Sequence, residues 1–191
     1  MKVLVIGGSG LLGYKLVEKA SEKYDTFLTY NFRPVQIEGC TALKLDKCDR
    51  EAVFELLEKI KPDVVIDTAA LHNVDYCETH PKEAWKVNVE GTRNVAEACK
   101  KIGARIIFIS TDYVFDGTKG CYTEEDEPNP LSYYAKTKLE AEKIIQSLGI
   151  SYIIARPSVI YGWNPNEVLG LKSSSGKSIN FVVWALQKLE K

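Results

Sequence analysis

The sequence predicts a doubly wound α/β domain built on a parallel sheet of six strands. Two observations carry this prediction: short β-branched apolar runs alternate with segments of helical period, and a glycine-rich turn follows the first run directly. Alternation of this kind implies right-handed crossovers between parallel strands. Because most runs are apolar throughout, helices should cover both faces of the sheet. We expect the strand order 3-2-1-4-5-6.

The predicted elements follow one another along the chain. The strands are the short apolar runs Val3–Ile6, Thr26–Tyr30, Ala42–Leu45, Asp63–Asp67, Ala104–Ser110 and Ser151–Ala155. The helices between them are Leu11–Glu22, Arg50–Ile60, Pro81–Ile102 and Leu131–Leu148. Asp49 is placed to cap the second helix, and Gly103 and Gly149 lie just past the ends of the third and fourth. After residue 162 a polar loop leads to Ser178, a suitable cap for a last helix that ends at Lys191.

Composition and charge exclude several classes of protein. The chain of 191 residues has a formal net charge of −1, which argues against nucleic acid or a membrane surface as a partner. No apolar run approaches about 20 residues, the length that spans a bilayer. The five cysteines are scattered without CxxC spacing, so neither a metal site nor a disulfide framework is expected. A reduced, cytoplasmic compartment fits best.

A glycine-rich turn joins the first predicted strand to the first helix. Gly7, Gly10 and Gly13 have the spacing GxxGxxG. The first glycine permits a tight turn, the second lets the backbone approach a pyrophosphate, and the third lets the helix pack closely on the sheet. An ordinary strand-to-helix turn is the alternative. In this context the pattern predicts a Rossmann-like dinucleotide-binding domain over residues 1–162.

The end of the second strand bears on the choice of dinucleotide. A strand that holds the ribose of NAD usually ends in an acid. Here the strand runs into Asn31-Phe32-Arg33, where Arg33 suits a 2′-phosphate, although a solvated loop arginine is about as common. NADP(H) is therefore the preferred cofactor and NAD(H) the alternative. Asp46, which ends the third strand, is placed to accept a hydrogen bond from the adenine amino group.

Tyr134 and Lys138 form a YxxxK pattern on the fourth predicted helix. Residues four apart share a helix face, so we expect the ammonium to bring the pKa of the phenol from about 10 toward neutrality, where it can act as an acid or base. Tyr133 lacks a lysine at this spacing. Thr111 lies at the carboxyl edge of the sheet, where it can donate to the carbonyl oxygen that Tyr134 protonates. Asn88 serves either a proton relay or a structural role.

Five segments resemble the extended short-chain dehydrogenase/reductases, and most closely the dTDP-4-dehydrorhamnose reductase subgroup. They are GGSGLLG at 7–13, LDKCD at 45–49, KVNVEGTRN at 86–94, STDYVFDG at 110–117 and YAKTKLEAEK at 134–143. The resemblance implies a catalytic set of Thr111, Tyr134 and Lys138, and substrate contacts from Ser110 and Thr111. It implies cofactor contacts from Gly7, Gly10, Leu11, Leu12, Gly13, Asn31, Phe32, Arg33, Asp46, Lys47, Ala69, Ala70, Leu71, Tyr134 and Lys138.

The implied activity is NAD(P)H-dependent reduction of the C4 ketone of a dTDP-linked 4-dehydro-6-deoxysugar, as in dTDP-rhamnose biosynthesis. The implied partner is therefore a nucleotide sugar, and a homodimer is compatible with this interpretation. Residues 163–191 would begin a substrate-binding lobe that is largely missing. The sequence departs from the subgroup at Asp67, where asparagine is frequent, and at Val159, where some members have tryptophan.

Three related functions are weighed against this one. A sugar-nucleotide 4,6-dehydratase needs a glutamate where this chain has Tyr113, so dehydration is disfavoured. A 4-epimerase needs a pocket in which the ketosugar rotates, which the sequence does not show. The regulatory β subunit of methionine adenosyltransferase has similar segments and binds NADP and a partner protein. That non-enzymatic function stays open.

Overall fold

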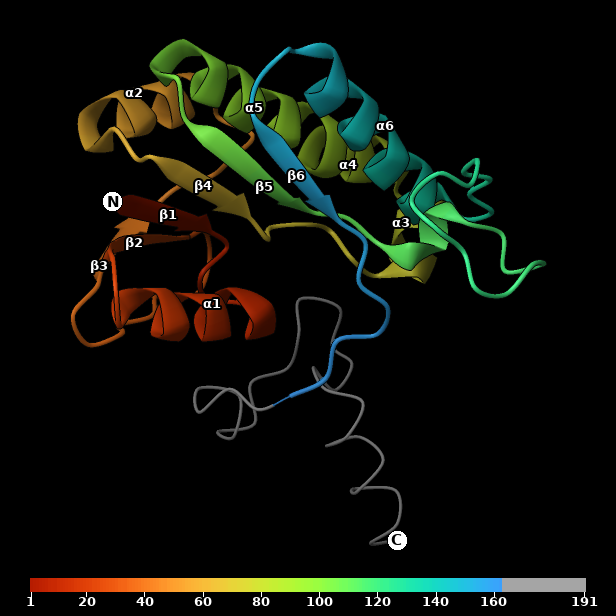
Figure 1. Cartoon of the computed structure of the whole chain (residues 1–191), viewed down its shortest axis with the longest axis horizontal. Coiled ribbons are helices and arrows are strands. Elements are labelled where there is room, and N and C mark those ends of the chain that lie inside the picture. The colour runs from red at the N-terminus through yellow and green to blue at the C-terminus, as the bar shows by residue number, and fades with distance from the viewer. Residues whose placement is uncertain (163–191) are drawn as a thin grey trace, which may run out of the picture. The chain divides into compact units, whose positions relative to one another are not determined.

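The computed structural model describes residues 1–162, of which Met1–Ser158 form one compact unit. Its centre is a six-stranded sheet in the order β3-β2-β1-β4-β5-β6 (Figure 1). All neighbouring strands are parallel. The strands are β1 Lys2–Ile6, β2 Asp25–Tyr30, β3 Thr41–Lys44, β4 Val64–Asp67, β5 Arg105–Ile109 and β6 Tyr152–Ala155. The predicted Rossmann-like fold and its strand order are confirmed.

Helices cover both faces of the sheet, as the apolar runs predicted. The helix α1 lies against β1 and β2 on one face, and α2, α5 and α6 pack together on the other (Figure 1). The helices are α1 Leu11–Ser21, α2 Arg50–Ile60, α3 Val74–Thr79, α4 Pro81–Trp85, α5 Gly91–Ile102 and α6 Tyr133–Ser147. A π-helical turn spans Lys86–Glu90, and a 3-10 turn spans Asp112–Val114.

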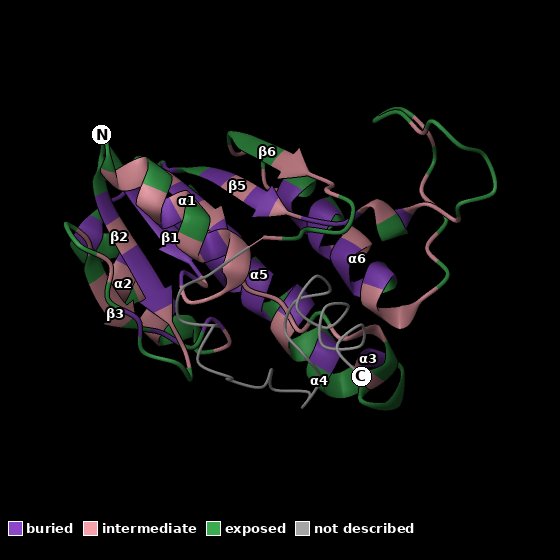
Figure 2. Cartoon of the chain, turned by 90° about the horizontal axis from the view of Figure 1, so that it is seen from below, coloured by how far each residue is buried: buried purple, intermediate pink, exposed green. Residues whose placement is uncertain are grey.

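The first strand shows why its run is apolar throughout. Val3 and Val5 pack with Val17 of α1, whereas Leu4 and Ile6 belong to the larger core on the opposite face. Successive side chains of a strand point to opposite faces, so a strand covered on both sides buries every residue. Val3 to Ile6 are all buried, whereas buried and intermediate residues alternate along β5, where Figure 2 shows purple beside pink.

The local signals for helix ends are partly confirmed. The Asp49 side chain accepts from the Ala52 amide at 3.1 Å and caps α2. Gly103 and Gly149 have left-handed φ values of 74° and 66°, which glycine adopts without strain. The predicted last helix and the whole of residues 163–191 lie outside the described residues.

The helix predicted over Pro81–Ile102 is confirmed in its bounds, but the prediction did not contain the π-helical turn at Lys86–Glu90, which lies between α4 and α5. The prediction also missed α3, although Asn73 supplies a cap by accepting from the Tyr76 amide at 3.0 Å. An apolar stripe at helical spacing does not reveal one extra residue per turn, and a helix of six residues is too short to show a period.

Candidate functional site

The glycine turn between β1 and α1 leaves no room for side chains. Gly7 has φ +83°, and a Cβ on it would lie 2.8 Å from the Thr68 hydroxyl oxygen. A Cβ on Gly13 would lie 2.3 Å from the carbonyl oxygen of Gly7. Gly10 is the N-cap residue of α1 and has no side chain that could accept a hydrogen bond. The first amides of the helix are therefore not bound by a capping side chain. Such a turn fits a dinucleotide pyrophosphate at the helix N-terminus.

Two further segments with predicted cofactor contacts follow the ends of β2 and β3, at the same edge of the sheet. Asn31 is half-buried, Phe32 is 88% exposed, and Arg33 is exposed. Asp46 is exposed, and its carboxylate accepts from the Cys48 amide at 2.9 Å. The structure thus places these predicted contacts together, on the surface beside the glycine turn.

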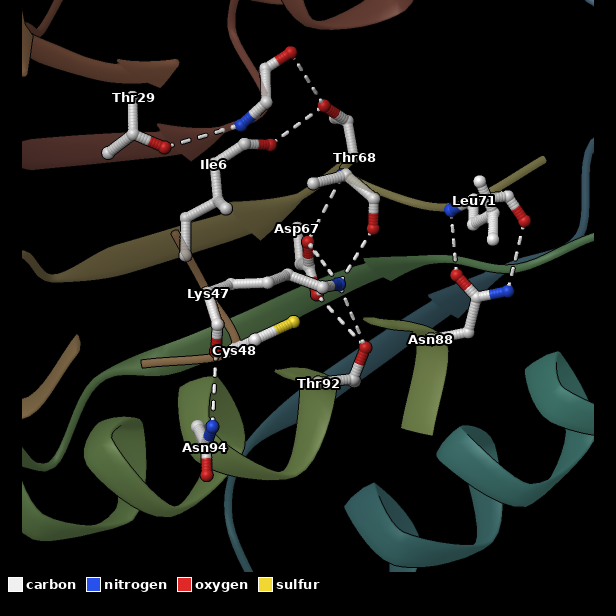
Figure 3. A network of polar contacts seen from close by, with 12 residues as sticks. Ile6, Thr29, Lys47, Cys48, Asp67, Thr68, Leu71, Asn88, Thr92 and Asn94 are labelled. Carbon is white, nitrogen blue, oxygen red and sulfur yellow. Dashed lines mark hydrogen bonds and ion pairs between the residues drawn. The ribbon is translucent and has the colours of Figure 1, made fainter. Parts of the chain in front are cut away.

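The turn after β4, at Ala69–Leu71, is held by Asn88 of the π-helical turn. The Asn88 amide oxygen accepts from the Leu71 N–H at 2.8 Å, and its amide nitrogen donates to the Leu71 carbonyl at 3.1 Å (Figure 3). That nitrogen also donates to the Thr137 hydroxyl at 3.0 Å, which itself donates to the Tyr134 carbonyl at 2.6 Å. Both amide hydrogens are therefore engaged, which favours the structural role for Asn88.

The predicted catalytic residues meet at the start of α6. The Ser132 side chain accepts from the Ala135 amide at 3.2 Å and so fixes the first turn of the helix, which carries Tyr134. Lys138, one turn later, is only 2% exposed, and its ammonium lies 4.0 Å from the centre of the Phe108 ring. Thr111 is buried, its hydroxyl donates to the Asp112 carboxylate at 3.4 Å and accepts from the Tyr113 amide at 3.2 Å, and it lies near enough to Tyr134 to act on the pKa of that phenol.

The ionisation of this pair differs from the prediction. Burial raises the pKa of Tyr134 to about 12, the Cys77 thiol adds to this rise, and the Thr111 hydroxyl opposes it. Burial also lowers the pKa of Lys138 to about 7, an effect that Lys47 strengthens. The prediction that Lys138 brings the pKa of Tyr134 toward neutrality is wrong for this structure, because burial is the largest influence on that pKa and raises it.

Lys47 and Ser110 have partners that the sequence did not indicate. The Lys47 ammonium donates to Asp67, Thr92 and the Ala69 carbonyl, which leaves none of its three protons for a cofactor (Figure 3). The Ser110 hydroxyl donates to the buried carboxylate of Glu142 rather than lining an open site. The implied contacts of these two side chains with cofactor and substrate are therefore replaced by internal ones.

Glu142 is the residue that the sequence analysis missed. Its carboxylate is buried and accepts from two nitrogens of Arg156, Nη2 at 2.6 Å and Nε at 3.1 Å. It lies four residues after Lys138 on the same helix face, and it opposes the burial effect that lowers the pKa of that lysine. The spacing of Tyr134, Lys138 and Glu142 along one face was the available signal.

A hollow of about 580 Å³ opens beside these residues. Its walls include Asp112, Tyr113 and Phe115 from the segment after Thr111, together with Ser132 and Arg156. Aromatic faces and hydrogen-bonding groups therefore line it together. Within residues 1–162, no group of acidic, histidine or cysteine side chains could hold a metal ion. No helix in this part of the chain is long and apolar enough to cross a membrane.

The glycine turn at the carboxyl edge of the sheet and the Thr–Tyr–Lys set beside it define the class of extended short-chain dehydrogenase/reductases. Within that class, the chain belongs to the family described as RmlD substrate binding domain, whose model matches residues 1–183. The resemblance inferred from the sequence is confirmed at this level.

Individual relatives bear different names. The β subunit of methionine adenosyltransferase 2 from Bos taurus is 37% identical over 168 residues, covering 84% of this chain and 47% of that protein. A dTDP-4-dehydrorhamnose reductase from Aggregatibacter actinomycetemcomitans is 35% identical over 162 residues, covering 84% and 52%. The dTDP-4-dehydrorhamnose reductase of Bacillus anthracis, solved in complex with NADP, gives a TM-score of 0.75 at 32% identity, covering 88% and 57%. The chain thus spans about half the length of these relatives.

Proposed function

We propose that this chain forms the catalytic and cofactor-binding part of a reductase that uses NADP(H) to reduce the C4 ketone of a dTDP-linked 4-dehydro-6-deoxysugar. The observation that carries the proposal is the meeting of Thr111, Tyr134 and Lys138 at the sheet edge that also bears the glycine turn. Relatives named dTDP-4-dehydrorhamnose reductase support the choice of sugar.

The side chains divide the chemistry among them. The nicotinamide, when bound, supplies the hydride that reduces the carbonyl carbon. Tyr134 donates its proton to the carbonyl oxygen, and its raised pKa keeps the phenol protonated at neutral pH. Thr111 donates a hydrogen bond to the same oxygen and so stabilises the charge that develops there. Lys138, in its charged form, stabilises the phenolate until a solvent proton restores the phenol.

Three of the segments with predicted cofactor contacts bind the pyrophosphate, the adenine and the 2′-phosphate. The first amides of α1 receive the pyrophosphate, in the space that the glycines at 7 and 13 keep open. Asp46 accepts from the adenine, and Arg33 pairs with the 2′-phosphate, which selects NADP(H). The exposure of both side chains leaves them free to make these contacts.

An absorbance assay at the nicotinamide band, with the ketosugar as substrate and NADPH as cofactor, tests this function. We expect saturable NADPH oxidation that depends on the sugar. Tight NADPH binding by calorimetry without any oxidation would contradict the proposal, and would favour a protein that binds the cofactor for another purpose.

A second candidate is a regulatory subunit that binds NADP. It is favoured by the 37% identity to the β subunit of methionine adenosyltransferase 2. Co-purification with a methionine adenosyltransferase, and a change in the activity of that enzyme, would support this function. The two candidates are therefore separated by ketosugar turnover on one side and complex formation on the other.

A further inference from the structure

We propose that the buried ion pair between Lys47 and Asp67 is a positioning device, which clamps the turn at Ala69 and whose two charges act on Lys138 in opposite directions. This inference rests on the proposed function only in the role given to Lys138. Lys47 follows β3 and Asp67 ends β4, so the pair joins two strands that are not neighbours in the sheet. Neither residue belongs to the proposed catalytic set.

The ion pair is isolated from water and fully hydrogen-bonded. The side chains of Lys47 and Asp67 are 4% and 0% exposed, and their charged atoms lie 2.9 Å apart. The ammonium also donates to the Thr92 hydroxyl at 3.0 Å, and that hydroxyl donates to the Asp67 carboxylate at 3.3 Å. Buried charges persist only when paired and hydrogen-bonded in this way.

The neighbouring residues are shaped to receive the lysine. A Cβ on Gly91 would lie 2.9 Å from Cγ and 3.0 Å from Cε of Lys47, so the first residue of α5 must be small. The Asn94 side chain donates to the Lys47 carbonyl at 3.1 Å and holds its backbone (Figure 3). Space and hydrogen bonds from the same helix thus fix both ends of the residue.

The pair holds the turn after β4 through both polar groups of one residue. The Asp67 carboxylate accepts from the Ala69 N–H at 3.1 Å, and the Lys47 ammonium donates to the Ala69 carbonyl at 2.7 Å. Two residues later, Asn88 binds both polar groups of Leu71. The turn that is expected to contact the cofactor is therefore fixed from the protein interior.

The pair also acts on Lys138 across the core. Besides burial, the charges that affect the pKa of Lys138 are Lys47, which lowers it, and Asp67 and Glu142, which raise it. Glu142 is itself paired with Arg156. The uncharged groups nearby are the Phe108 ring beneath the ammonium and the Tyr134 phenol on the same helix face. Lys47 and Asp67 thus oppose each other, and their effects on Lys138 partly cancel.

Because the two charges act on Lys138 in opposite directions, their removal should shift its pKa in opposite directions. A purely structural role of the pair would not produce this result. We would make Lys47→Met, Asp67→Asn and the double variant in the full chain, with Lys136→Met as an exposed control on α6. The titration of Lys138 would be followed by NMR of ¹³C-labelled lysine side chains, without cofactor or substrate. We expect Lys47→Met to raise the pKa of Lys138 and Asp67→Asn to lower it, each by about half a pH unit or more. In the double variant, the pKa of Lys138 should lie close to its value in the parent protein.

Hydrogen exchange measures the other half of the proposal, the clamp on the turn. We expect the Ala69 amide to exchange at least about tenfold faster in the double variant, which leaves no unpaired charge and should fold. The inference would be overturned if the pKa of Lys138 moved in the same direction in both single variants. It would also be overturned if the Ala69 amide exchanged at the parent rate in the folded double variant. Because no readout depends on turnover, these results are independent of whether the parent reduces the ketosugar.

Discussion

The two sides of the candidate site are built in opposite ways. Around α6 and the turn after β4, polar side chains are buried and bound to one another, as Asn88 with Thr137 and Glu142 with Ser110 show. After β2, Phe32 is 88% exposed, and the Arg33 side chain has no ion pair within residues 1–162. The side chains of the first region are therefore held in place by the protein itself, whereas Phe32 and Arg33 of the second are exposed to solvent. Substitutions should affect chemistry and folding in the first region, and cofactor affinity alone in the second.

The largest effect is expected for the proton donor in the first region. Tyr134→Phe should lower the rate of ketone reduction about 10³-fold, which is within the range that a positioned acid contributes. The affinity for NADPH should stay nearly unchanged. Steady-state kinetics and calorimetry on the same preparations provide the measurement. Tyr133→Phe is the matched control one residue earlier. If Tyr133→Phe proved to be the inactive variant, the assignment of the acid would be wrong.

Substitutions in the first region should also lower the stability of the fold. Glu142→Gln removes the charge that pairs with Arg156, and this pair is largely buried. We expect a loss of about 3 kcal/mol in the free energy of unfolding by urea, because breaking a buried pair leaves one charge without compensation. Glu140→Gln is the control on the same helix, since its contact with Lys143 is exposed and 3.9 Å long. Equal losses for the two variants would show that the burial of Glu142 has no energetic weight.

The same contrast explains what the sequence could and could not predict. The strand order and the glycine turn follow from local patterns, namely apolar runs and glycine spacing, and both were found. The partners of Lys47 and Ser110 depend on residues that are distant in the chain, such as Asp67 and Glu142. A sequence pattern shows that a lysine follows a strand, but not that an ion pair buries it.

The pKa of Tyr134 was mispredicted for a related reason. The spacing of Tyr134 and Lys138 along a helix is a local property, and it correctly placed both residues on one face. Burial is a property of the whole fold, and here it raises the pKa of the phenol more than nearby groups lower it. Patterns of spacing thus predict which groups come together, whereas their ionisation depends on packing that only the structure shows.

The smallest effect is expected on the exposed side, and it measures the other half of the contrast. Arg33→Ala should weaken NADPH binding by about 1–3 kcal/mol, the scale of a charge-assisted hydrogen bond, and barely change NADH binding. Unfolding stability should stay the same, because Arg33 is exposed and unpaired within the described part of the chain. Calorimetry with both cofactors gives the affinities. Arg105→Ala is the control, since Arg105 is an exposed arginine at the start of β5, on the opposite edge of the sheet. An equal loss for NADPH and NADH would mean that Arg33 does not meet the 2′-phosphate, and that the loop after β2 does not choose the cofactor.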